Sequence, residues 1–188
     1  MKRIIGIIII ILLFSAKIVY PLTADNIEIA NDRDYFGKIH QLLSESKKSI
    51  YLLMFSAHYY DRYPDSPTNI LLRDLANAKK RGVDVKVVLE QEPEEREGIF
   101  GKKKIQPDHQ GAVKAFLDRN NIPCVMDDPL VTLHAKVIIV DGLYTVIGST
   151  NWSYSAMEKN KETAVIIESP ETADCYQKYF DRLFTGRE

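Results

Sequence analysis

The sequence is poor in the features that mark several classes of protein. Only two cysteines occur in 188 residues, too few for a disulfide-built scaffold or a four-thiolate zinc site. Charge of one sign is not in excess, since 25 Lys and Arg face 26 Asp and Glu. Neither a GxxxxGK[ST] loop nor a GxGxxG fingerprint occurs, so a nucleotide cofactor has no obvious cradle. With 45% apolar residues, a packed core must supply most of the stability.

The longest apolar run stands at the start of the chain. Lys2 and Arg3 precede residues 4–14, in which only Gly6 is not strongly apolar. Eleven helical residues span only about half of a ~30 Å hydrocarbon core. We therefore expect residues 1–24 to be a cleaved export signal, which implies a periplasmic or secreted protein. The alternative is an uncleaved N-terminal membrane anchor that associates the protein with a membrane.

Residues 25–188 are expected to form a single domain with a formal charge of −4, because they keep 22 basic and 26 acidic side chains. This excludes a uniformly basic nucleic-acid coat. Contact with a polyanion must be local, for example through residues 79–81 or 102–104, although such runs also serve simply as solvated surface. Cys124 and Cys175 could pair in an oxidising compartment, and the sequence leaves that pairing open.

Helical and strand patterns alternate along the first half of this domain. Residues 34–48 repeat apolar side chains at helical spacing, residues 49–57 form a buried-strand run, and residues 91–108 read as a long surface loop. Further strands are expected at 83–90, 122–126, 133–140, 144–147 and 162–167, and further helices around Leu75, Phe116 and Phe180. Asp141-Gly142 predicts a hairpin turn. The pattern predicts an α/β fold with a mixed β-sheet flanked by helices.

A polar pair interrupts one of these strands. His134 and Lys136 are two residues apart in LHAKVIIV, so in a strand both side chains project to the same face. A chain that needed only a core would place apolar residues there, because buried polar groups without partners are costly. The hairpin returns the chain, so Ser149 and Asn151 are expected within reach of the same face.

Together these residues resemble the HKD motif of the phospholipase D superfamily. The matching positions are His134-x-Lys136-x-x-x-x-Asp141 and Gly148-Ser149-x-Asn151. Glu162 follows in strand-like sequence, and the runs at 49–57 and 83–90 look like the opening strands of the family. The resemblance extends from Ser49 to the C-terminus and implies the phospholipase D/nuclease-like sandwich.

The resemblance implies phosphodiester hydrolysis that needs no metal ion or other cofactor. His134 would attack phosphorus and form a phosphohistidine intermediate. Lys136 and Asn151 would hold the non-bridging oxygens, and Ser149 could add a further donor. Glu162 would bind the far ring nitrogen of His134 and fix its tautomer.

One histidine cannot efficiently act both as the nucleophile and as the acid that protonates the leaving oxygen. In the family two HKD motifs meet at one site, whereas this chain has one. The resemblance therefore implies a homodimer whose twofold axis passes near the catalytic centre, with His134 of one subunit attacking and His134 of the other protonating the leaving group.

Several other residues have weaker signals. Asp141 adjoins a turn glycine and is expected to be a supporting carboxylate rather than a reactant. His58 lies where a strand runs into a loop and is a candidate to line the substrate cleft, the alternative being an ordinary surface residue. No role is expected for His40 or His109. Trp152 is expected to pack in the core, with a base-stacking platform as the alternative.

The resemblance defines the reaction class better than the substrate. Short single-motif chains with an export signal are most similar to bacterial endonucleases that cut DNA and RNA with little sequence preference, so nucleic acid is the expected substrate. The alternative is a phospholipase D-type lipid phosphodiesterase that acts on phospholipid or cardiolipin, which a membrane anchor would favour. An inactive binding module is disfavoured because every expected polar position is filled. Strand preference and product polarity stay open.

Overall fold

The computed structural model describes residues 21–91, 95–97, 103–105 and 109–186. Most of the expected leader, residues 1–20, lies outside the described residues. Among the residues that are described, no helix is long and apolar enough to cross a membrane. Cys124 and Cys175 are both free thiols in the structure.

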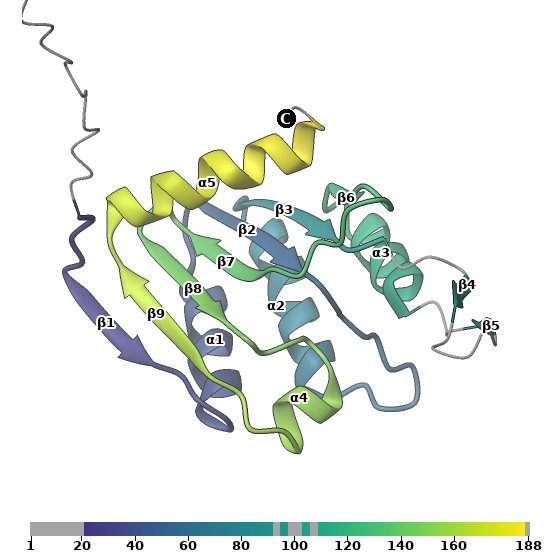
Figure 1. Ribbon diagram of the computed structural model, residues 1–188. Helices are drawn as coiled ribbons and strands as arrows, with labels where there is room; N and C mark the ends of the chain where they lie inside the picture. The colour runs from purple at the N-terminus through teal and green to yellow at the C-terminus, as the bar shows by residue number, and fades with distance from the viewer. Residues whose placement is uncertain (1–20, 92–94, 98–102, 106–108, 187–188) are drawn as a thin grey trace, which may run out of the picture.

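A mixed seven-stranded sheet forms the centre of the fold (Figure 1). Its strand order is β1-β9-β8-β7-β2-β3-β6. β2 pairs in parallel with β3, and β3 with β6, whereas the other neighbours are antiparallel. The strands are β1 (Asn26–Ile29), β2 (Ser49–Met54), β3 (Asp84–Leu89), β6 (Cys124–Met126), β7 (Lys136–Val140), β8 (Tyr144–Gly148) and β9 (Ala164–Glu168).

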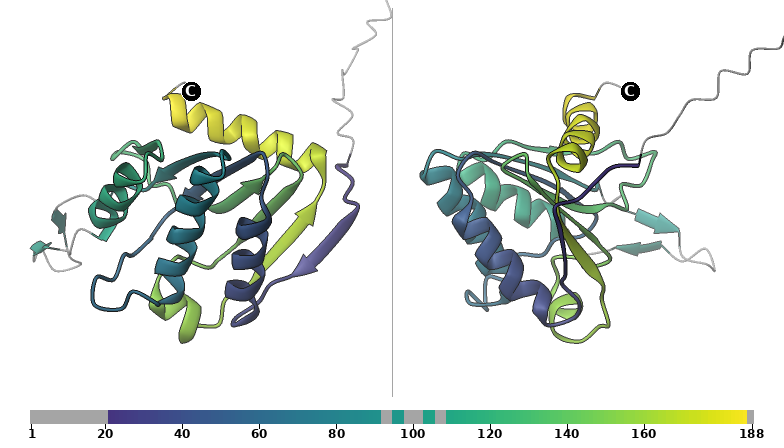
Figure 2. Two further views of the ribbon diagram at one scale, coloured as in Figure 1. Left: turned by 180° about the vertical axis from the view of Figure 1, so that it is seen from behind. Right: turned by 90° about the vertical axis from the view of Figure 1, so that its left-hand side faces the viewer.

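Helices cover both faces of this sheet, which confirms the predicted α/β architecture (Figure 2). The helices are α1 (Asp34–Glu45), α2 (Pro67–Lys80), α3 (His109–Arg119), the short α4 (Tyr154–Glu158) and α5 (Pro170–Thr185). One apolar cluster joins α1, α2 and α3 to one face through side chains such as Leu52 and Ile138. A second cluster joins α5 to the other face through Leu53, Ile139 and Phe180. Successive strand residues thus serve opposite cores, as the pleat requires.

Local signals explain where the main helices begin. α2 follows Ser66, whose side chain accepts a hydrogen bond from the Asn69 amide, and Pro67 occupies the first turn. α5 begins in the same way after Ser169, which caps the Thr172 amide. Such serine caps satisfy amides that have no partner within the helix, and proline fits the first turn because no donor is lost.

The structure corrects the expectation of a featureless loop over residues 91–108. Two short strands, β4 (Glu95–Glu97) and β5 (Lys103–Ile105), pair antiparallel within it. Their sequences, ERE and KKI, carry too few apolar residues for an alternating pattern. β1 and α4 were also not expected, and both are only four or five residues long, which is too short to show a reliable period.

Candidate active site

The motif residues gather at one end of the sheet, where β7 begins and β8 ends. Lys136 is the first residue of β7 and pairs with Met54, the last residue of β2. β8 ends at Gly148, which pairs with Ala164 at the start of β9. Antiparallel pairing therefore brings the entry to β7, the exit from β8 and the entry to β9 to one edge, here called the catalytic edge.

His134 is exposed at this edge, and the structure corrects its expected placement on a strand. β7 begins only at Lys136, so a shared strand face does not relate the two side chains. Instead the Lys136 ammonium donates a hydrogen bond to the His134 carbonyl at 2.8 Å. The imidazole lies against the Phe55 ring, with centroids 4.4 Å apart. Phe55 was missed as a site residue, although it stands at the end of the apolar run that forms β2.

Lys136 is a nearly buried charge, with 8% of the residue exposed. Its ammonium lies 4.5 Å from the centroid of the Phe55 ring, a cation–π contact. Burial lowers the pKa of Lys136, and the nearby charge of Glu162 partly opposes that shift. An ammonium kept largely out of water attracts an anionic oxygen more strongly than a solvated one does.

Ser149 and Glu162 form a tight pair at the same edge. The Ser149 hydroxyl donates to a Glu162 carboxylate oxygen at 2.5 Å and accepts from the Thr163 amide at 3.1 Å. The Asn160 amide group donates to the other carboxylate oxygen at 2.9 Å. The expected bond from Glu162 to the His134 ring is not among the hydrogen bonds of the described residues. In this chain Glu162 instead accepts a hydrogen bond from Ser149. The Ser149 hydroxyl proton is therefore already used in a hydrogen bond within the protein.

Gly148 allows this pair to form. A Cβ atom at this position would lie 2.3 Å from the Thr163 carbonyl oxygen and 2.6 Å from the Ala164 Cβ. Real side chains do not approach so closely, so only glycine lets the end of β8 lie against the segment that carries Glu162.

Asn151 reaches the site with an unsatisfied group. Its side-chain oxygen is buried and has no hydrogen-bond partner among the described residues, as is also true of the Thr150 hydroxyl. A buried polar atom without a partner is unusual, and such atoms occur where a ligand completes the hydrogen bonding. The unsatisfied atom is an acceptor, so it would take a donor from a ligand, and donation from the Asn151 amide nitrogen to phosphoryl oxygens stays a prediction.

Asp141 lies at the other end of β7 and supports the fold there. Its carboxylate accepts hydrogen bonds from the backbone amides of Lys47, Lys48 and Ser49 at 2.9, 2.7 and 3.0 Å. Its φ of 58° places it in the turn before β8. Trp152 also has a structural place, since it is fully buried and donates to the Tyr35 hydroxyl at 3.2 Å. This contact supports packing rather than base stacking.

His58 is half-buried and engaged on both ring nitrogens. It forms hydrogen bonds with the Tyr60 hydroxyl at 3.0 Å and the Ser56 hydroxyl at 3.3 Å. Its ring stacks on that of His109, with centroids 4.0 Å apart. Burial, and then the neighbouring His109, lowers the pKa of His58 to about 4. His58 is therefore neutral at pH 7.

Two further polar side chains have defined partners, and of these only Gln110 contacts a residue of the site. Gln110, at the start of α3, is buried, donates to the Phe55 carbonyl at 2.7 Å and accepts from the Ala57 amide at 3.3 Å. His40 lies on α1 and binds the Asp74 carboxylate at 2.6 Å. Within the described ranges, no group of three or more His, Cys, Asp or Glu side chains is placed to hold a metal ion.

Comparison with known proteins agrees with this geometry. Residues 39–184 match the family model described as "Cardiolipin synthase, PLD-like domain". This chain belongs to the phospholipase D superfamily. The matched residues of this phospholipase D-like chain include the whole catalytic edge.

Solved structures share the fold. The phospholipase D family member Nuc from Salmonella typhimurium superposes with a TM-score of 0.68 at 24% identity, over 85% of this chain and 94% of that chain. NucT from Helicobacter pylori gives a TM-score of 0.60 at 18% identity, over 85% of this chain and 96% of that chain.

Relatives found by sequence are named for activities on lipids. Phospholipase D from Rickettsia typhi is 27% identical over 146 residues, which is 77% of this chain and 60% of the relative. Mitochondrial cardiolipin hydrolase from Danio rerio is 39% identical over 54 residues, 29% of this chain and 24% of the relative. The phospholipase D-like chain thus spans from about a quarter to somewhat over half of the length of these relatives.

Proposed function

We propose that this protein is a metal-independent phosphodiesterase that hydrolyses DNA and RNA through a phosphohistidine intermediate. The observation that carries the proposal is the catalytic edge itself, where the exposed His134 is tied to the nearly buried Lys136 ammonium and Asn151 follows the end of β8. Membership of the phospholipase D superfamily supports the same reaction class.

The proposed reaction has two displacements. The neutral His134 ring attacks phosphorus, a P–N bond forms and the P–O bond to the leaving group breaks. The leaving oxygen takes a proton from a second histidine ring, which begins as imidazolium and becomes neutral. Water then gives a proton to this imidazole and attacks phosphorus, which breaks the P–N bond and frees His134. Lys136 and Asn151 stabilise charge on the non-bridging oxygens in both steps. Ser149 and Glu162 support the site as a hydrogen-bonded pair.

The second imidazole comes from another copy of the chain. Among the described residues, the other histidines are occupied: His40 binds Asp74, and His58 and His109 stack on each other. We therefore propose a homodimer in which the two His134 rings face each other across one phosphorus atom. We also propose that residues 1–24 are an export signal, with an uncleaved membrane anchor as the alternative.

A lipid phosphodiesterase is the second candidate because of one surface feature. Leu130 and Val131 are 90% and 62% exposed, and they precede His134 by only a few residues. Exposed aliphatic side chains beside a site suit contact with acyl chains. The lipid names of the curated relatives agree with this alternative.

The test compares three proteins on two kinds of substrate. The unchanged protein should nick plasmid and degrade single-stranded DNA in excess EDTA, and His134→Ala should lose at least 10³-fold in rate while the dimer persists. His40→Gln, on α1 away from the catalytic edge, should keep the rate. Cleavage by His134→Ala, or a requirement for divalent metal, would refute the mechanism. Hydrolysis of cardiolipin vesicles without cleavage of nucleic acid would establish the lipid function instead.

A further inference from the structure

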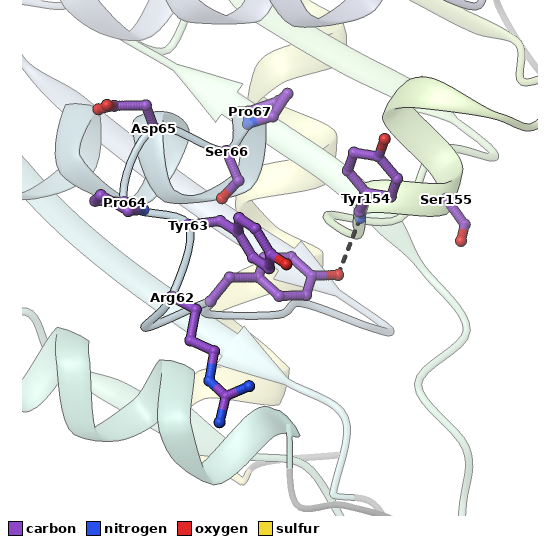
Figure 3. Close-up of a pocket in the computed structure, with 9 residues that line it drawn as sticks. Arg62, Tyr63, Pro64, Asp65, Ser66, Pro67, Tyr154 and Ser155 are labelled. Atoms are coloured by element: carbon purple, nitrogen blue, oxygen red, sulfur yellow. Dashed lines mark hydrogen bonds between the residues drawn. The ribbon is translucent and has the colours of Figure 1, made fainter.

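A second surface feature lies beside the catalytic edge. A groove of about 800 Å³ runs between the loop from β2 to α2 and the start of α4 (Figure 3). We call it the tyrosine groove and define it by Tyr60, Arg62, Tyr63 and Tyr154. Its remaining lining residues are proline, serine and one aspartate, and none is Leu, Ile, Val or Phe.

The tyrosine groove is held in shape by a buried amide. The Asn69 side chain is almost fully buried, accepts from the Tyr60 amide at 3.0 Å, and donates to the Tyr60 and Tyr63 carbonyls at 2.9 and 3.1 Å. The Tyr60 hydroxyl also accepts from the Tyr154 amide at 3.1 Å, which ties the loop to α4 (Figure 3). The aromatic side chains are thus presented by a fixed backbone, although Tyr63 is 68% and Tyr154 46% exposed. A backbone that is already ordered loses little entropy when a ligand binds.

The tyrosine groove continues directly from the catalytic edge. Ala57 and Trp152 form an isolated parallel bridge, so the chain leaving Phe55 and the chain leaving Asn151 enter the groove side by side. Tyr154 lies three positions after Asn151 in the chain, which limits the distance between their Cα atoms to about 11 Å. A strand bound at the catalytic edge therefore needs only a few nucleotides to reach the groove.

The charge of the tyrosine groove suits an anion. Asp65 is paired with Arg73 at 3.2 Å, and Arg62 has no ion pair or hydrogen bond with the other described residues. The exposed Arg62 guanidinium is thus left to bind a group from outside the chain. Guanidinium beside aromatic rings is the combination that binds phosphate together with a stacked base.

We infer that the tyrosine groove binds a single-stranded segment of the nucleic-acid substrate, with unpaired bases stacked on Tyr63 and Tyr154 and a phosphate on Arg62. The inference rests on the proposed function and adds a strand preference to it. Bases inside a duplex already stack on one another, so only an unpaired strand offers its faces to the rings. Acyl chains would need aliphatic walls, which this lining lacks.

Binding is measured without cleavage by placing each change in the His134→Ala protein. A fluorescent thymidine oligonucleotide should bind at least tenfold more weakly after Tyr63→Ala with Tyr154→Ala, because each stacked base contributes substantially to affinity. An abasic oligonucleotide of equal charge should bind the parent weakly, and the two alanine substitutions should reduce its affinity little further. Arg62→Gln should reduce the slope of log affinity against log salt concentration by about one, because one fewer counterion is released on binding.

Two further variants serve as controls. Tyr63→Phe with Tyr154→Phe keeps the rings and should restore binding, which separates stacking from a failure to fold. Tyr179→Ala with Arg182→Gln removes the same residue types from α5, where the Arg182 guanidinium lies 5.6 Å from the centroid of the Tyr179 ring, and should leave affinity unchanged.

The outcomes distinguish the inference from the proposed function. Equal binding of the normal oligonucleotide by the parent and the alanine variant would overturn the inference, while cleavage of DNA by the unchanged protein would still support the proposed function. If the Tyr63→Ala with Tyr154→Ala variant bound the oligonucleotide normally but no longer bound phosphatidylglycerol vesicles, the groove would be a membrane-binding site. This result would also overturn the inference. A protein that neither cleaves nor binds nucleic acid would refute both.

Discussion

Lys136 shows how the fold changes the chemistry of a single side chain. It is nearly buried, its pKa is lowered by burial, and its ammonium contacts the Phe55 ring and the His134 carbonyl. Lys136→Met should lower the cleavage rate at least 10²-fold because the charge on the phosphoryl oxygens loses its main partner. The free energy of unfolding should change by no more than about 1 kcal/mol, since methionine removes a desolvated charge and keeps most of the volume.

Lys86 provides the matched control for this prediction. Its ammonium lies 5.2 Å from the centroid of the Tyr51 ring and 2.7 Å from Asp84, away from the catalytic edge on β3. Lys86→Met should keep the rate of the unchanged protein in the same assay. Equal reductions of the cleavage rate in Lys136→Met and Lys86→Met would show that Lys136 does not act on the reacting phosphoryl group.

His58 makes stability depend on pH. Its pKa is about 4 in the folded protein and ~6.5 in an unfolded chain, so the unfolded state binds more protons between these values. The stabilisation is complete above about pH 6.5 and is lost as the pH falls toward 4. Because the ring is only half-buried, we expect the unfolding free energy to drop between pH 7 and pH 5 by about 1 kcal/mol more than in His58→Gln. Urea unfolding at both pH values measures this, and equal drops would contradict it.

The motif residues could be predicted from sequence because their types and spacing are specific, but their partners could not. Phe55 and Gln110 contact the site through chain segments distant in sequence. The pairing of Glu162 with Ser149 depends on how β8 and β9 align. Such contacts leave no periodic signal in the sequence.

Gly148 tests how precisely two elements must meet. Gly148→Ala would force a Cβ against the Thr163 carbonyl and should cost about 2–3 kcal/mol of unfolding free energy, while separating Ser149 from Glu162 and reducing the cleavage rate. Gly37→Ala on α1 is the control, because nothing lies within 4 Å of its added Cβ, and it should stabilise the protein by about 0.5–1 kcal/mol. Urea unfolding and rate measurements decide, and a fully stable, active Gly148→Ala would disprove the requirement for close contact.

Elements with a strong burial pattern were predicted, and elements without one were not. β2 and β3 bury most of their residues, so their apolar runs are visible in the sequence. All four residues of β1 are exposed, so its strand conformation depends on pairing with β9 and not on its own pattern. Strand ends were also misplaced, as at β7, because pairing with β2 and β8 sets where a strand begins.

At the scale of the whole molecule, the proposed homodimer predicts how mixtures behave. Wild-type subunits exchanged with a ninefold excess of His134→Ala would be found almost entirely in mixed dimers that lack one of the two rings. Activity per wild-type subunit should then fall to about one tenth. Energy transfer between labelled subunits confirms that exchange has occurred, and undiminished activity after exchange would show that each chain works alone.

The overall architecture followed from alternating helical and strand patterns, whereas the strand order did not. Only the hairpin from β7 to β8 could be placed from its turn residues. The position of β7 beside β2, which brings Lys136 next to Met54 and Phe55, joins segments some 80 residues apart in the chain. Pairing over such separations depends on the complete core.

The pairing of β1 with β9 determines where the polypeptide enters the fold. Asn26 lies opposite Glu168, and the Thr23 carbonyl accepts a hydrogen bond from Ser169 at 2.6 Å. This entry point is separated from Glu162 by the length of β9, roughly 17 Å. A bead or dye attached at this entry point would therefore lie at the end of the sheet opposite the reactive end, so the protein could be immobilised with that end facing the solution.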